Sequence, residues 1–312
     1  MSAQYALAVD FGGTKVEAAL VNATGQVLQG SRFRNPTGAS SSSDELGERV
    51  LATAASALEM LPPDGVLDGI GIGCAGPITV REGLVSPLNV PAWRGFPLRD
   101  LVHTIAPDTP ITLQMDGMCI ALAEQWIGSA RGSENVMGMI VSTGIGGGLI
   151  LNGRTVAGPT GNAGHIGHVE VAGFDDPCAC GGFGCVEAIA SGPKTVAWAK
   201  KQGWSGSSGE ELAVDYAAGD EIAVAAVQRS GSAIGQAIAS ATALVDLDIV
   251  AIGGGFIKVS PDIFNYIRAA IATRQQFDFV TKVQVVPSGL SADGPLVGAA
   301  ALVHHKAMVP SF

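Results

Sequence analysis

The sequence has few charged residues, few aromatic ones and no excess of positive charge. Charged residues make up 15% of the 312 positions and aromatic residues 5%, and 18 basic side chains stand against 28 acidic ones, a net charge of −10. A nucleic-acid surface usually carries clustered basic residues, and single strands are held largely by stacked aromatic rings. The composition therefore argues against a nucleic-acid partner, while the 47% hydrophobic content argues for a folded chain.

Segments that would direct the chain into or across a membrane are also missing. No uninterrupted apolar run reaches the roughly 18 residues of a membrane span, and the first residues lack the pattern of a signal peptide. Three of the five cysteines fall between positions 178 and 185, unlike a secreted disulfide framework. We therefore expect no membrane partner and a cytoplasmic protein.

Two common nucleotide-binding signatures are absent or out of place. The Walker pattern G-x-x-x-x-G-K-[ST] does not occur in the chain. Residues Gly71–Gly76 do match G-x-G-x-x-G after a predicted strand, but Pro77 follows where a helix should begin. Both the P-loop and the dinucleotide-binding interpretations are therefore set aside.

Glycine, by contrast, is abundant. The 43 glycines are about twice the usual share of roughly 7%, which is typical of tight turns and of backbone that approaches a ligand closely. Hydrophobic periodicity and turn residues predict strands at 5–10, 16–21, 26–34, 66–74, 111–115, 136–142, 148–151, 248–252 and 282–286. They predict helices from a capping box at Ser42 and Glu45 to before Pro62, and at 117–128, 191–201, 222–245, 261–276 and 294–305. The mixture indicates an α/β protein, and a strand–glycine turn–strand unit in each half hints at a duplicated fold without a close sequence repeat.

The first glycine turn is Asp10-Phe11-Gly12-Gly13-Thr14-Lys15. A carboxylate at the end of a strand, two glycines and a hydroxyl can form a hairpin whose amides face phosphate oxygens. Asp10 would hold Mg²⁺ directly or through water, because hard cations prefer oxygen ligands. An ordinary hairpin turn is the alternative. The candidate ATP-binding residues here are Asp10, Gly12, Gly13, Thr14 and Lys15.

The second glycine turn, Ser142–Gly148, strengthens the nucleotide hypothesis. It offers two hydroxyls and a run of unobstructed amides, with Thr143, Gly144 and Gly146 as candidate ATP-binding residues. Gly253-Gly254-Gly255 follows a predicted buried strand and would leave room for a flat base or a ribose. Gly254 and Gly255 therefore join the candidate nucleotide site.

The cysteine cluster predicts a metal site. Cys178, Cys180 and Cys185, with His168 ten residues before the first of them, supply three thiolates and one imidazole. That donor set suits a closed tetrahedral structural Zn²⁺ site. A disulfide is the alternative, but Cys178 and Cys180 are only two positions apart in an expected reducing compartment.

Asp116 follows the predicted strand 111–115 and precedes a helix. Catalytic groups concentrate in loops at strand ends, although an isolated Asp at such a position is more often a helix cap. From its position alone, the cap is the more common role.

Together these motifs resemble the ROK family of sugar kinases and related repressors, within the actin-like ATPase superfamily. The Asp-x-Gly-Gly-Thr-Lys hairpin is shared with the wider superfamily. The stretch Gly164-His165-Ile166-Gly167-His168, followed by Cys178-x-Cys180-Gly181-x-x-Gly184-Cys185-x-Glu187, is more specific and is similar to the family signature. The resemblance runs from Asp10 almost to the C-terminus.

The resemblance implies two ribonuclease-H-like lobes with ATP and sugar in the cleft between them. We expect the first lobe at 1–116, with the closing helix at 294–312, and the second at 117–293. The resemblance also implies a homodimer or homotetramer and a zinc site that shapes the sugar pocket. It makes Asp116 the catalytic base and assigns sugar contacts to Asn89, Asp116, His165, His168 and Glu187.

The sequence departs from the family pattern in two motifs. The family commonly has Asn-Asp-Ala-Asn around the catalytic Asp, where this chain has Met115-Asp116-Gly117-Met118, and a thioether cannot replace an amide as a hydrogen-bond donor. His165 stands where Glu is commoner, which is similar to bacterial N-acetylmannosamine kinases. The stretch from Asn89 to Trp93 is closer to glucokinases.

The resulting hypothesis is an ATP-dependent kinase for the 6-hydroxyl of a hexose, either glucose or an N-acetylhexosamine, with N-acetylmannosamine kinase as the alternative. A repressor is less expected, because family repressors carry a winged-helix segment before the hairpin and only nine residues precede Asp10 here. A sugar-binding protein without kinase activity is a further alternative, motivated by Met115 and Met118.

Overall fold

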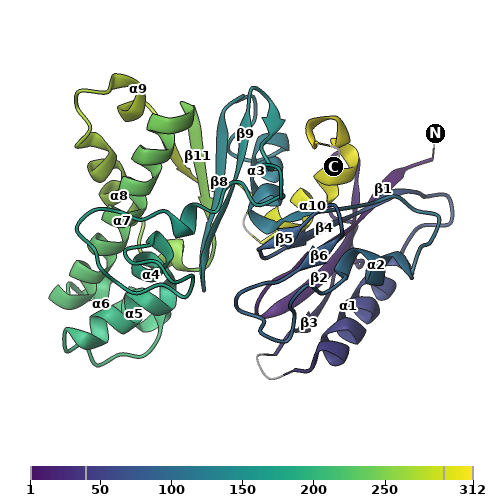
Figure 1. Cartoon of the computed structure of the whole chain (residues 1–312), viewed down its shortest axis with the longest axis horizontal. Coiled ribbons are helices and arrows are strands. Elements are labelled where there is room, and N and C mark those ends of the chain that lie inside the picture. Colours follow the sequence, from purple (N-terminus) through teal and green to yellow (C-terminus); the bar gives the residue numbers. More distant parts are fainter. Residues whose placement is uncertain (1, 39–40, 291, 311–312) are drawn as a thin grey trace. The chain divides into compact units, whose positions relative to one another are not determined.

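The computed structural model describes residues 2–38, 41–290 and 292–310, and their contacts divide the chain into two compact units (Figure 1). Unit 1 comprises Met1–Gly132, Gly148–Gly164 and Gly289–Phe312, and unit 2 comprises Ser133–Gly147 and His165–Ser288. Sequence analysis ends the first lobe at Asp116. In the structure, the helix that follows Asp116 packs against the closing helix, so both belong to unit 1.

Unit 1 is built on a five-stranded mixed sheet with the order β3-β2-β1-β4-β7. β1 pairs antiparallel with β2 and parallel with β4, and β4 pairs parallel with β7. The strands are β1 (Gln4–Phe11), β2 (Lys15–Asn22), β3 (Phe33–Pro36), β4 (Val66–Cys74) and β7 (Ile111–Met115), and a separate hairpin joins β5 (Ile78–Thr79) to β6 (Leu84–Val85). Asp10 therefore stands at the end of a central strand.

Helices cover both faces of this sheet. Leu7, Val9 and Phe11 point to one face of β1, and they share one core with the buried side of helix α1 (Ser43–Leu58). The opposite face carries small residues and receives α10 (Gly294–His304), which lies so close that a Cβ at Gly71 would collide with the backbone of Ala299. The glycines of the G-x-G-x-x-G stretch therefore serve helix packing, and β5 rather than a helix follows β4.

The remaining elements of unit 1 are helices α2 (Leu98–His103) and α3 (Asp116–Trp126), the hairpin strand β10 (Arg154–Thr155) and the short helix η3 (Lys306–Met308). The capping box at Ser42 and Glu45 is confirmed. The predicted strand at 26–34 is wrong. Gly30 adopts a left-handed φ of 82° and Ser31 N donates to Leu28 O, so the chain turns there and β3 begins only at Phe33.

Unit 2 contains three parallel strands and most of the helices (Figure 1). Strand β8 (Val136–Val141) pairs with β11 (Ile249–Gly253), which pairs with β12 (Gln284–Pro287). The helices are η1 (Ile166–His168), α4 (Val186–Ala190), α5 (Gly192–Lys201), α6 (Gly209–Ala218), α7 (Glu221–Val245), η2 (Phe256–Val259), α8 (Ile263–Ala272) and α9 (Asp278–Thr281). Sequence analysis missed α4 and α6 and made α8 too long.

The two halves of the chain repeat one strand order. After β8 and the glycine turn comes β9 (Ile145–Leu151), and the second sheet has the order β10-β9-β8-β11-β12, the same arrangement as β3-β2-β1-β4-β7. The strand–glycine turn–strand units noticed in the sequence occupy equivalent places in the two sheets. None of the helices in the described part of the chain is long and apolar enough to cross a membrane.

Candidate functional site

Unit 1 brings two carboxylates of the predicted site together. Asp10 is the next-to-last residue of β1, and Asp116 is the first residue of helix α3 at the end of β7, two strands away in the same sheet. Met115, not Asp116, is the capping residue of α3, and Gly117 N donates to Asp116 Oδ1 over 2.7 Å. The cap role considered from the sequence is therefore wrong. Asp116 instead occupies the first helical turn, where the helix dipole favours negative charge.

The environment of Asp10 disfavours the ionised form of its carboxyl group. Burial first, and then the negative charge of Asp116, raises the pKa of Asp10 from 3.8 to about 7, and nearby Lys15 only partly offsets this. A cation between or beside the two carboxylates would relieve that repulsion. Asp10 therefore fits the predicted role of supporting Mg²⁺.

A cluster of ion pairs lies next to the first glycine turn, centred on one buried glutamate of β2. Glu17 is fully buried on β2 and is paired with Lys15, Arg32 and Arg34. Burial alone would raise the pKa of Glu17, but hydrogen bonds from Lys15 and Arg34 and the nearby positive charges lower it. Lys15 is thus held by a partner within the sheet. Sequence analysis missed Glu17, although a carboxylate within an apolar strand beside a lysine was a usable signal.

Asn89 lies against the hairpin, because a side chain at Gly13 would collide with its amide. The two methionines that depart from the family pattern do not line a polar surface. Met115 is 2% exposed and belongs to the core of unit 1, and Met118 is 1% exposed on α3. Their side chains are packed within unit 1.

Unit 2 holds the second glycine turn and the acidic residue of the signature. Glu187 lies on α4, and its Oε2 accepts a hydrogen bond of 2.8 Å from Ile145 N in the turn. The same oxygen would be 2.7 Å from a Cβ at Gly144. Glu187 therefore braces the turn between β8 and β9, while Gly254 and Gly255 lie beside Val141 and Ser142 at the end of β8.

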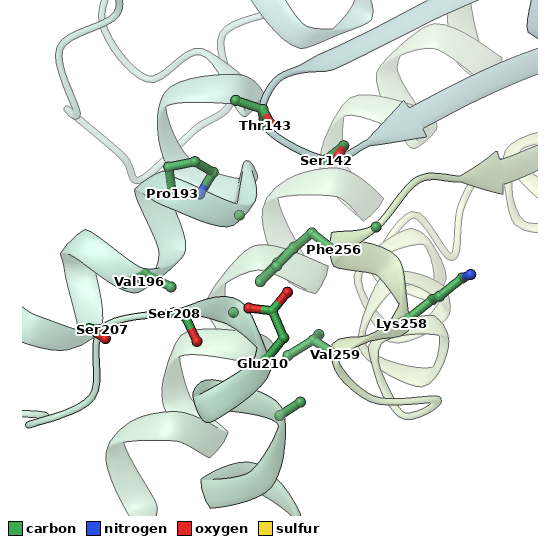
Figure 2. Close-up of a pocket in the computed structure, with 14 residues that line it drawn as sticks. Ser142, Thr143, Pro193, Val196, Ser207, Ser208, Glu210, Phe256, Lys258 and Val259 are labelled. Atoms are coloured by element: carbon green, nitrogen blue, oxygen red, sulfur yellow. The ribbon is translucent and has the colours of Figure 1, made fainter. Parts of the chain in front are cut away.

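A pocket opens beside this turn within unit 2 (Figure 2). Its volume is about 560 Å³, within the usual range of small-molecule sites. One end is formed by Ser142 and Thr143 of the second glycine turn together with Gly255, and Thr143 and Gly255 are among the candidate ATP-binding residues. The rest is mostly apolar, and its lining includes Val196, Ala213, Phe256 and Val259 together with Ser208, Glu210 and Lys258.

The predicted metal ligands also converge in unit 2. One ligand atom from each of His168, Cys178, Cys180 and Cys185 lies within 4.8 Å of the others. The Sγ atoms of Cys180 and Cys185 are 3.6 Å apart, as are Cys178 Sγ and His168 Nδ1. All five cysteines are free thiols, so the disulfide alternative is not seen. Metal–sulfur bonds of about 2.3 Å in a tetrahedron separate sulfurs by a little under 4 Å, so these residues fit Zn²⁺.

His165 and His168 lie side by side, with ring centroids 5.8 Å apart. Burial first, and then the neighbouring His168, lower the pKa of His165, which Glu187 only partly opposes. A neutral imidazole can both donate and accept hydrogen bonds, as recognition of a sugar hydroxyl requires. The histidines and Glu187 thus occupy one region of unit 2.

The pocket also contains residues that sequence analysis did not find. Helix α6 was missed, and with it Ser208 and Glu210. The signal was present in the sequence, because Ser208 and Glu211 have capping-box spacing. In the structure Glu211 N donates to Ser208 Oγ over 3.1 Å, and Glu211 Oε2 accepts from Ser207 N over 2.7 Å.

Comparisons with known proteins agree with these features. Residues 6–306 match the ROK family. An N-acetylmannosamine kinase of Yersinia pseudotuberculosis is 34% identical over 301 residues, 94% of this chain and 96% of the relative. A ROK hexokinase from Thermus thermophilus has a TM-score of 0.82 at 28% identity, covering 97% of this chain and 99% of that structure.

A ROK family glucokinase from Streptomyces griseus, solved with glucose and AMPPNP, has the same TM-score of 0.82. It is 27% identical and covers 96% of this chain and 99% of that structure. The expected actin-like ATPase fold is confirmed by these structural relatives. The chain therefore belongs to the ROK family and has the fold of its sugar kinases.

Proposed function

We propose that this ROK sugar kinase transfers the γ-phosphoryl group of ATP to the 6-hydroxyl of a hexose or an N-acetylhexosamine. The observation that carries the proposal is the pair of carboxylates at strand ends of one sheet of unit 1, buried Asp10 and half-buried Asp116, beside a hairpin suited to phosphate. Phosphoryl transfer depends mainly on positioning and charge neutralisation, which this arrangement can supply.

The two carboxylates have different tasks in the proposed reaction. Asp116 accepts the proton of the attacking hydroxyl as the general base, from the first turn of α3. Asp10 supports Mg²⁺, which neutralises charge on the phosphates when bound. The amides of the first hairpin, together with Lys15, face the phosphate oxygens.

The pocket of unit 2 would hold the nucleotide. Thr143, Gly144 and Gly146 would contact phosphate oxygens from the second turn. Gly254 and Gly255 would leave room for the base or the ribose, and the apolar lining by Phe256 and Val196 suits a flat base. Sugar contacts are assigned to Asn89, His165, His168 and Glu187. The second ring nitrogen of His168, opposite the one directed to the cysteines, remains available for the sugar region.

N-acetylmannosamine is the first substrate to test, because a relative with that activity in its name is 34% identical over nearly the whole chain. Glucose comes second, on the strength of the glucokinase structure solved with glucose. ADP release should be measured with Mg-ATP over a panel of hexoses and N-acetylhexosamines at saturating concentration. Strong turnover on one sugar supports the kinase activity and identifies its substrate. If no sugar of the panel led to ADP release although sugar still bound, a non-catalytic role would be favoured.

We further propose that His168, Cys178, Cys180 and Cys185 hold a structural zinc ion. Purified protein should contain about one zinc per chain, and Cys180→Ser should lose it together with several kcal/mol of unfolding free energy, because metal binding at such sites is part of folding. Metal analysis and thermal unfolding measure both effects. Cys119→Ala, which changes a buried thiol of unit 1, is the control and should retain the zinc. Freely titrating thiols and no metal in the wild type would contradict the site.

A further inference from the structure

We propose that Glu210 is a specificity-determining residue for the phosphoryl donor, and that its carboxylate accepts a hydrogen bond from the nucleoside part of ATP. The inference rests on the proposed function and extends it to a residue outside the family motifs discussed above. The donor atom on the nucleoside is either a ribose hydroxyl or the exocyclic amine of the base. The carboxylate can bind both kinds of group for the same chemical reason, since it only accepts hydrogen bonds.

Glu210 lies in the first turn of α6, on the wall of the pocket beside the second glycine turn. Figure 2 shows its carboxylate turned into the middle of the lining residues, near the Phe256 side chain, while the amino end of Lys258 is turned outward. The pocket thus has one inward-facing charge among mainly apolar walls. That charge is negative.

The neighbouring residue, Glu211, already helps to cap the N-terminus of α6. Glu211 accepts from Ser207 N, and its own amide donates to Ser208, so the start of α6 is capped without Glu210. Among the described residues, the side chain of Glu210 forms no hydrogen bond or ion pair. A side chain that contributes nothing to the cap, and that faces a pocket, is available to a ligand.

The sign of the charge decides which part of the nucleotide it meets. Phosphates belong at the Ser142–Thr143 end of the pocket, where hydroxyls and free amides gather, because a carboxylate would repel them. Glu210 lies on the other side, beside the apolar residues that suit a base. A single acceptor there favours a nucleoside with a hydrogen-bond donor and disfavours one that presents an oxygen acceptor at the same point.

The test uses full-length protein and two variants, Glu210→Ala and the control Glu221→Ala. Glu221 is also an exposed glutamate in the first turn of a unit 2 helix with a capped N-terminus, but it does not line the pocket. Binding of ATP, 2′-deoxy-ATP, 3′-deoxy-ATP and inosine triphosphate is measured by calorimetry in the absence of sugar. KM for each donor is then measured with the best sugar, and melting temperatures check that the variants fold.

A hydrogen bond to a charged group changes affinity by about ten- to a hundred-fold. If the ribose is the donor, the wild type binds one of the deoxynucleotides more weakly than ATP by that factor. If the base amine is the donor, inosine triphosphate is the weak ligand. In either case Glu210→Ala weakens ATP binding and abolishes the preference, while Glu221→Ala keeps both.

Two results overturn the inference: a wild type that binds all four nucleotides equally, or a preference that survives in Glu210→Ala. Neither result touches the proposed kinase activity, which would still be visible as ATP binding and sugar-dependent turnover. Conversely, a wild type that binds no nucleotide at all contradicts the proposed function itself. The two failures are therefore distinguishable.

Discussion

The two glycine turns occupy equivalent positions in two sheets of the same strand order, yet they differ in charge. The first turn begins with buried Asp10 and ends with Lys15, which pairs with buried Glu17, and two arginines complete the ion cluster. The second turn has hydroxyls and glycines but no ionisable side chain of its own, and it is braced from outside by Glu187. A common backbone arrangement thus carries two different electrostatic environments.

The difference in charge suggests how the two turns divide the proposed kinase reaction between them. Charged groups that must be buried are costly and are therefore tied to specific partners, which suits the part of the site where phosphoryl transfer occurs. Amides and hydroxyls bind phosphate without that cost, which suits a turn that holds a nucleotide. Four substitutions test this division, and we expect their effects to fall in the order below.

Asp116→Asn should have the largest effect. Removing a general base typically lowers turnover by 10²–10⁴-fold, so we expect a loss of about a thousand-fold in kcat with nucleotide affinity nearly unchanged. Steady-state kinetics and calorimetry measure the two quantities. Asp44→Asn, an exposed aspartate in the first turn of α1, is the matched control and should leave both unchanged. If Asp116→Asn kept more than about a tenth of wild-type turnover, the assignment of the base would be wrong.

Asp10→Asn should separate activity from stability. Because the pKa of Asp10 is raised to about 7, the metal-free wild type loses stability as pH rises from near 4 towards 7, when a buried charge must form. The variant lacks this charge. Its free energy of unfolding should therefore equal that of the wild type near pH 4 and exceed it by about 2–4 kcal/mol above pH 7. Mg-ATP turnover should nevertheless fall.

Urea unfolding of the metal-free protein at several pH values measures the stability difference. Asp108→Asn, at an exposed position of unit 1, serves as the control and should show no comparable trend. A stability difference for Asp10→Asn that stays constant across this range would show that Asp10 is ionised at no cost, contrary to its burial.

Gly148→Ala should displace helix α3, which begins with Asp116. In unit 1, a Cβ at Gly148 on β9 would collide with the backbone of Gly117 and Met118 at the start of α3. Overpacking of this kind costs about 1–3 kcal/mol, and displacement of Asp116 should lower kcat more than it changes either KM. Gly47→Ala on α1 is the control, because its Cβ would meet neighbours at ordinary distances of 3.5 and 3.6 Å. We expect that change to be neutral or slightly stabilising. If Gly148→Ala had wild-type stability and wild-type kcat, close packing of Gly148 against the start of α3 would not position Asp116.

Thr143→Ala should have the smallest effect. Loss of one neutral hydroxyl at the phosphate end of the pocket should raise KM for ATP by about three- to ten-fold and leave kcat unchanged. Thr143→Ser retains the hydroxyl and should restore wild-type KM. A fall in kcat as large as that of Asp116→Asn would show that the second turn takes part in the chemistry as directly as the first.

Sequence analysis found most of the elements because their signals are local. The capping box at Ser42 and Glu45, the apolar run of β1 and the metal-ligand spacing of the cysteines can each be recognised within a short window. The strand at 26–34 was misjudged because its residues favour an extended chain, while a turn at Gly30 is imposed by the register of β3 on β2. Met115 and Met118 were judged by the residues they replace, whereas burial shows that they pack in unit 1.

Residue types and their spacing by themselves determined the α/β class, the two glycine turns, the candidate zinc ligands and the family resemblance. Only the tertiary structure decided which charges are buried and which groups they meet, because Asp10 and Glu17 acquire their environments from strands and helices distant in the chain. It also decided that Glu210 faces a pocket while Glu211 caps a helix. Two adjacent glutamates have the same chemistry in the sequence, and only the direction in which the helix presents each one gives them different roles.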